Sequence, residues 1–188
     1  LPVLIGDIDL SANSKFDVSE SWILIGDINV NSGASNIDGL ALPAAPARLE
    51  GGRIVLQSGA IILDQPDESL IFDAPFEQTF RGTTTTIENS GTITFNNITE
   101  LDGQFRMNGS NASLVVNAHV TIDQPDFNLD GSGSSSNVLT IGDNGYLDLN
   151  LGAGGDTSLS GTVLIDGGVL DIDTPAGFFS LAANRQIL

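Results

Sequence analysis

Short alternating stretches are the feature that most limits how this chain can fold. In residues 146–151 (YLDLNL) aliphatic side chains alternate with Asp and Asn, and residues 169–173 (VLDID) repeat the pattern after a Gly-Gly turn. Because successive side chains of a β-strand point to opposite faces, this alternation predicts strands with one apolar and one polar face. Each stretch is too short to bury its apolar face alone, so many of them must associate.

The chain also contains internal copies. Residues 1–10 (LPVLIGDIDL) and 22–30 (WILIGDINV) are nearly identical and are offset by 20 residues. A repeat of that length is typical of solenoids, in which each turn stacks on the one before. The tetrapeptide DQPD follows an aliphatic run at Asp64 and again at Asp123. Pro and Asp are turn-forming residues, so the sequence predicts the same corner twice.

These patterns predict an all-β fold, a right-handed parallel β-helix (β-solenoid) that forms a single domain over residues 1–188. An antiparallel β-sandwich is the alternative, because Asn108-Gly109 and Asn144-Gly145 are suited to tight hairpins. Loop insertions are predicted near residues 31–52 and 73–86, where the alternation stops. The first residue is Leu1 and no signal peptide is visible, so we expect a fragment or processed part of a longer chain.

Composition excludes several partners. The net charge is −18, and the six basic residues are scattered, so no cluster is available to bind nucleic acid or an anionic membrane surface. No apolar run reaches the roughly 18 residues of a membrane span. Cysteine is absent, which excludes disulfides, Cys-based metal sites and a thiol nucleophile.

Three segments carry a family resemblance: residues 90–97 (SGTITFNN), 144–155 (NGYLDLNLGAGG) and 160–173 (SGTVLIDGGVLDID). They resemble the passenger repeats of bacterial autotransporters and related haemagglutinin-like surface adhesins, over roughly residues 86–172. The resemblance implies a secreted or surface-displayed β-solenoid with an adhesive or scaffolding role, and it supplies no catalytic residues. We therefore expect a non-enzymatic extracellular or cell-surface protein whose partner is a host or surface glycan or protein.

One motif suggests calcium. Asp126, Asn128 and Asp130, followed by Gly131, match the first half of an EF-hand loop, in which alternate oxygen ligands converge on the ion. Asn137 stands where that loop would supply a bidentate Glu. An ordinary strand followed by a polar loop is the other interpretation. No other cofactor is predicted.

Acidic pairs suggest an enzymatic alternative. The pairs Asp7/Asp9, Asp148/Asn150 and Asp171/Asp173 each lie two residues apart, which places two oxygen-bearing groups on one strand face about 7 Å apart. That spacing lies between those of retaining and inverting glycosidases, so a carbohydrate-active β-helix (a tailspike-like polysaccharide lyase or hydrolase) stays open. Any solvated strand face produces such pairs, and the sole histidine, His119, has no nucleophile motif nearby. We therefore expect no enzyme.

Two further sites are predicted from breaks in the pattern. Phe76, Phe80 and Arg81 fall outside the alternation and are candidate ligand-binding loop residues, although phenylalanines here would equally cover one end of the core. Both chain ends, residues 1–5 and 186–188, are apolar and lack an evident cap. Exposed strand edges of this kind predict self-association into a fibre or oligomer.

Overall fold

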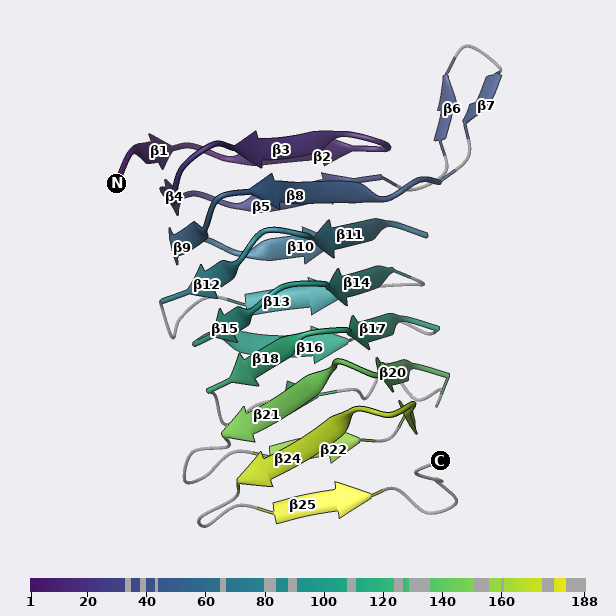
Figure 1. Ribbon diagram of the computed structural model, residues 1–188. Helices are drawn as coiled ribbons and strands as arrows, with labels where there is room; N and C mark the ends of the chain where they lie inside the picture. Colours follow the sequence, from purple (N-terminus) through teal and green to yellow (C-terminus); the bar gives the residue numbers. More distant parts are fainter. Residues whose placement is uncertain are drawn as a thin grey trace.

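The computed structural model describes most of the chain, and all regular structure in the described part is β. The described residues are 1–32, 35–37, 40–42, 44–64, 67–79, 84–87, 91–107, 111–123, 127–128, 136–150, 156–159, 161–173 and 178–181. Within these ranges no helix is long and apolar enough to cross a membrane. The strands stack turn upon turn along one axis (Figure 1). The predicted parallel β-solenoid is therefore confirmed.

Three parallel sheets, which we call sheets A, B and C, form the walls of the solenoid. Sheet A contains, in spatial order, β1 (Val3–Ile5), β4 (Trp22–Ile25), β9 (Ile54–Ser58), β12 (Phe76–Gln78), β15 (Thr99–Leu101), β18 (His119–Ile122), β21 (Tyr146–Asn150) and β24 (Val169–Asp173). Sheet B contains β2 (Ile8–Ser11), β5 (Ile28–Asn31), β10 (Ile61–Leu63), β13 (Thr84–Ile87), β16 (Gln104–Met107), β19 (Phe127–Asn128), β22 (Asp156–Leu159) and β25 (Phe178–Leu181). Sheet C contains β3 (Lys15–Val18), β8 (Ala47–Gly51), β11 (Ser69–Phe72), β14 (Thr92–Phe95), β17 (Ser113–Val116), β20 (Val138–Ile141) and β23 (Thr162–Ile165).

The internal copy corresponds to one turn of the solenoid. Val3 pairs with Ile23 in sheet A and Ile8 pairs with Ile28 in sheet B, so both pairs repeat the 20-residue offset of the sequence. The antiparallel sandwich is wrong, because every described pairing within the three sheets is parallel. Asn144-Gly145 lies in a turn between β20 and β21, which belong to different sheets, and therefore closes no hairpin.

The two DQPD segments occupy different corners, contrary to the sequence prediction. Asp64 follows β10 of sheet B, whereas Asp123 follows β18 of sheet A. A Pro-Asp turn specifies only that a strand ends, and it carries no information about which sheet the strand joined. The same tetrapeptide therefore follows strands of two different sheets.

The segment predicted as an insertion at residues 31–52 contains an antiparallel hairpin, β6 (Ser35–Ile37) with β7 (Leu40–Leu42), which projects from the stack (Figure 1). The chain rejoins the solenoid at β8. Ser32, fully buried at the base of the hairpin, donates its hydroxyl to the Ser69 carbonyl (2.9 Å) and accepts from the Ser69 amide (2.7 Å). This double hydrogen bond fixes where the hairpin leaves the stack.

The structure contradicts the loop insertion predicted near residues 73–86 at β12 and β13, the two strands within it. β12 pairs in parallel with β9 and β15, and β13 pairs in parallel with β10 and β16. These segments are regular turns of the solenoid. The alternation of apolar and polar residues is obscured in β12 (FEQ) and β13 (TTTI), because Gln and Thr occupy inward positions. Gln78 and Thr85 are both buried.

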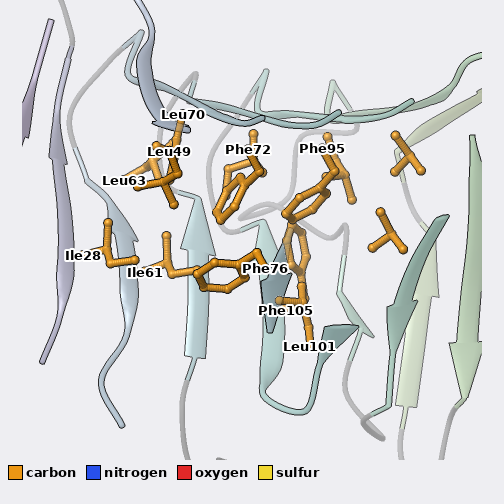
Figure 2. Packing of buried hydrophobic residues seen from close by; sticks show 14 of the residues in the cluster. Ile28, Leu49, Ile61, Leu63, Leu70, Phe72, Phe76, Phe95, Leu101 and Phe105 are labelled. Carbon is orange, nitrogen blue, oxygen red and sulfur yellow. The ribbon is translucent and has the colours of Figure 1, made fainter. Parts of the chain in front are cut away.

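Aliphatic and phenylalanine side chains fill the interior of the solenoid (Figure 2). The ring of Phe72 lies 4.8 Å from that of Phe76 and 4.8 Å from that of Phe95, centroid to centroid. All three are buried, as is Phe105. Because the rings come from successive turns and from two sheets, they join neighbouring turns and facing sheets into one core.

Polar side chains stack along one corner that follows sheet C. Arg48 donates to Asp73 (2.5 Å), Asn96 donates to Asp73 (2.8 Å), and Asn117 donates to Asn96 (3.0 Å). An amide both donates and accepts, so Asn can bond to the turns on both sides of it. This amide ladder continues the inter-turn hydrogen bonding beyond the strands.

Removing a central phenylalanine tests the shared core. We expect Phe95→Ala to lower the free energy of unfolding by about 3–5 kcal/mol, because the cavity opens between turns. The matched control is Thr94→Ala on the outer face of the same strand, for which we expect a change within about 0.5 kcal/mol. Urea unfolding followed by circular dichroism measures both. Equal losses in the two variants would contradict this account of the core.

Candidate functional site

Besides the amide ladder at the corner of sheet C, two places on the described outer surface bring together polar side chains from different turns. The first, which we call the sheet A ladder, consists of His119, Tyr146, Asp148, Asp171 and Asp173 on strands β18, β21 and β24. The second, the sheet B groove, is lined by Asp9, Asn29, Val30, Asn31, Ile62 and Asp64. Both are products of stacking, since neighbours within each come from successive turns.

In the sheet A ladder the register places related groups level with one another. His119 pairs with Tyr146, and Asp148 pairs with Asp171. The His119 and Tyr146 rings lie 4.8 Å apart, with 51° between their planes. The Tyr146 hydroxyl donates to Asp171 Oδ2 at 2.7 Å. An aromatic pair is thus tied to a stacked pair of carboxylates.

The electrostatics of the ladder follow from this stacking. Partial burial raises the pKa of Asp148, and the neighbouring Asp171 and Asp173 carboxylates raise it further, while His119 opposes the shift. The pKa of Tyr146 is also raised, first because its hydroxyl donates to Asp171. Parallel strands are about 4.8 Å apart, so the register forces the like charges together.

Such a pair has a chemical use. A carboxyl group that keeps its proton at higher pH, beside one that is ionised, is the arrangement with which glycosidases supply a general acid and a second carboxylate. The strands that carry the two residues are about 4.8 Å apart, whereas the carboxyl groups of retaining enzymes are about 5–5.5 Å apart. The two carboxylates that the structure places level with each other are Asp148 and Asp171, on neighbouring turns. The sequence predicts pairs along one strand instead, at Asp7/Asp9, Asp148/Asn150 and Asp171/Asp173.

The sheet B groove lies where the hairpin insertion begins. Asp9 on β2 pairs with Asn29 on β5, which pairs with Ile62 on β10, and Asp64 follows β10. Asn29 Nδ2 donates to Asp9 Oδ1 at 3.0 Å, which holds both side chains in place. β5 ends at Asn31, one residue before the buried Ser32 that anchors the hairpin. Together the lining residues surround a partly open hollow of about 270 Å³.

The predicted loop residues do not form a surface site as a set. Phe76 is only 2% exposed and packs against Phe72, so its assignment to a ligand-binding loop is wrong. Its position in β12 turns the ring inward, which agrees with the other interpretation, in which the phenylalanine covers the core. Phe80 and Arg81 lie outside the described residues.

The predicted calcium ligands are not brought together in the described part of the chain. Asp126 and Asp130 lie outside the described residues, and Asn128 is described only as part of β19. Among the described residues, no three His, Cys, Asp or Glu side chains are placed to share a metal ion. Asn137, at the position of the missing Glu, is buried: its amide donates to the Met107 carbonyl (3.1 Å) and accepts from the Ala112 amide (2.9 Å).

The two aspartates of the Asp7/Asp9 pair have different surroundings. Asp7 accepts from the backbone amide of Asp27 (2.9 Å), and Asp27 in turn accepts from that of Ala60 (2.8 Å). These carboxylates bind the corner between turns, whereas Asp9 belongs to the groove. Sequence reasoning missed the groove because it compared residues along one strand. The 20-residue copy aligns Asp9 with Asn29 and was the available signal.

Comparison with known proteins adds no identification. No protein-family model matches this chain, and neither the curated proteins nor the solved structures contain a match.

A pH titration tests the electrostatics of the ladder. Asp148 has a folded pKa above its ordinary value of 3.8, so its ionised form destabilises the fold at pH 7 and this penalty disappears as the pH falls below 3.8. We expect Asp148→Asn to stabilise the protein at pH 7, by no more than about 1 kcal/mol for a carboxyl at the surface. Unfolding curves at pH 7 and pH 3.5 measure the difference.

The control for that titration is Asp166→Asn, which changes an exposed carboxylate in the turn after β23. A gain from Asp148→Asn that is as large at pH 3.5 as at pH 7 would contradict the electrostatic explanation, as would an equal gain in the control.

Proposed function

We propose that the protein is a non-enzymatic β-solenoid with a structural or adhesive role at an extracellular or cell surface, of the kind seen in autotransporter passengers and haemagglutinin-like adhesins. The stack of parallel sheets is the observation that carries the proposal. Such a stack is stiff, and it repeats its outer side chains at fixed intervals along an extended wall. Its function then lies in what it presents and contacts.

The charge of that surface favours uncharged or cationic contacts. The net charge is −18, and three basic residues are neutralised within the fold: Lys15 pairs with Glu50, Arg48 with Asp73 and Arg53 with Glu77. An acidic wall repels polyanions such as nucleic acid and anionic lipid. A glycan or a protein of host or surface origin is the partner we propose.

Adhesion without turnover tests this role. We expect beads coated with the protein to be retained on immobilised glycans or surface proteins, while the soluble protein releases no reducing ends or unsaturated products from polysaccharides. Uncoated beads, and beads coated with heat-unfolded protein, are the controls. Polysaccharide cleavage by the purified protein would contradict the proposal, and so would failure of the folded protein to retain beads on any surface.

The enzymatic alternative is a carbohydrate-active β-helix, favoured by one observation: the raised pKa of Asp148 beside Asp171. If cleavage is found, this alternative expects Asp148→Asn and Asp171→Asn each to abolish it. Asp166→Asn would leave it unchanged. Cleavage that survives in both ladder variants would place the activity elsewhere.

Self-association through the chain-end strands is a further part of the proposal. β1 is the outermost described strand of sheet A, and Val3 and Ile5 on it are 51% and 79% exposed. Burying exposed aliphatic surface and pairing a strand edge both favour association. We expect the sedimentation coefficient to rise with protein concentration, and Val3→Lys with Ile5→Lys to reduce that rise. A coefficient independent of concentration for the unmodified chain would contradict it.

A further inference from the structure

The sheet B groove has the composition of a binding site for a hydroxyl-bearing ligand. Carboxylates of Asp9 and Asp64 supply acceptors, and the Asn31 amide supplies a donor as well as an acceptor. Ile62 contributes an aliphatic side chain beside Asn29 in the register, two residues before Asp64. The volume of about 270 Å³ lies just below the usual range for small-ligand pockets, about 300–1,000 Å³.

The two carboxylates are too far apart to share one ion. β2 and β10 are separated by one strand, and Asp64 lies two residues beyond the position level with Asp9. With about 4.8 Å between strands and about 3.3 Å per residue, their Cα atoms lie about 12 Å apart. Calcium holds its oxygen ligands at about 2.3–2.6 Å, so a ligand that contacts both carboxylates has to be larger than a single ion.

The groove is also held in shape before any ligand arrives. Asn29 Nδ2 donates to Asp9 Oδ1, and this bond restrains both side chains. The neighbouring Ser32–Ser69 hydrogen bonds fix the backbone where β5 ends. Preorganised polar groups lose less conformational entropy on binding, which favours affinity even in a small site.

We propose that the sheet B groove binds a neutral saccharide unit, with Asp9 and Asp64 accepting from its hydroxyls, Asn31 donating to a ring or hydroxyl oxygen, and Ile62 against its C–H face. A sugar needs donors, acceptors and apolar contact together, whereas a cation needs acceptors alone. This inference rests on the proposed adhesive role and names the class of partner for one site.

Isothermal titration with neutral tetrasaccharides built from glucose, galactose, mannose or N-acetylglucosamine tests the groove. We expect saturable binding of at least one of them. Asp9→Asn, Asp64→Asn and Asn31→Ala should each weaken it, the two Asp variants by roughly tenfold or more, since each loses a charge-assisted hydrogen bond. The matched control is Asp17→Asn, an exposed aspartate of β3 in sheet C, which should change affinity less than twofold.

Several results would contradict saccharide binding in the sheet B groove. These are no heat with any tetrasaccharide at millimolar concentration, binding that all three groove variants retain, or heat with calcium chloride or spermidine alone and none with sugar. The bead assay keeps this failure separate from failure of the adhesive role. If beads that carry the Asp9→Asn/Asp64→Asn double variant are still retained, the saccharide site in the groove is wrong but the adhesive role stands. If beads that carry the unmodified protein are not retained on any surface, the adhesive role itself is wrong.

Discussion

In-register pairing between successive turns is the constraint on which the rest of the structure depends. Each inner strand of the three sheets forms its main-chain hydrogen bonds with the strands one turn earlier and one turn later, so its side chains have neighbours about 4.8 Å away on either side. Inside the solenoid this favours stability, because Phe72, Phe95 and the aliphatic rows stack into a continuous core. On the outer surface, the same geometry brings polar side chains of successive turns together, so their charges decide whether the stacking is favourable.

The outer columns show two responses to that geometry. Along the corner that follows sheet C, Asn96 bonds to Asp73 on one side and to Asn117 on the other, so stacking adds hydrogen bonds. In the sheet A ladder, the stacked carboxylates repel, while the Tyr146 hydroxyl donates to Asp171 and His119 partly offsets the charge near Asp148. Amides are therefore suited to continuous polar ladders, whereas stacked aspartates store unfavourable energy that a proton or a ligand can relieve.

Much of the fold could be predicted from the sequence, because strand alternation and the 20-residue copy are local signals. They located the strands and identified the stack. The wrong predictions have a common cause: DQPD turns and the FEQ run of β12 do not reveal which sheet a segment joins or which way Phe76 points. That information depends on turn lengths, which vary because insertions such as the β6–β7 hairpin lengthen single turns.

The candidate sites were harder to predict for the same reason. In a solenoid, residues that act together come from different turns, so Asp9 and Asp64 share a groove and Asp148 faces Asp171 although neither pair forms a sequence motif. A regular stack presents similar columns all along its wall, and a site becomes distinct only where the regularity is interrupted. The base of the hairpin is such a place: β5 ends, Ser32 turns the chain outward, and the polar groups beside it line a hollow that a flat strand face does not have.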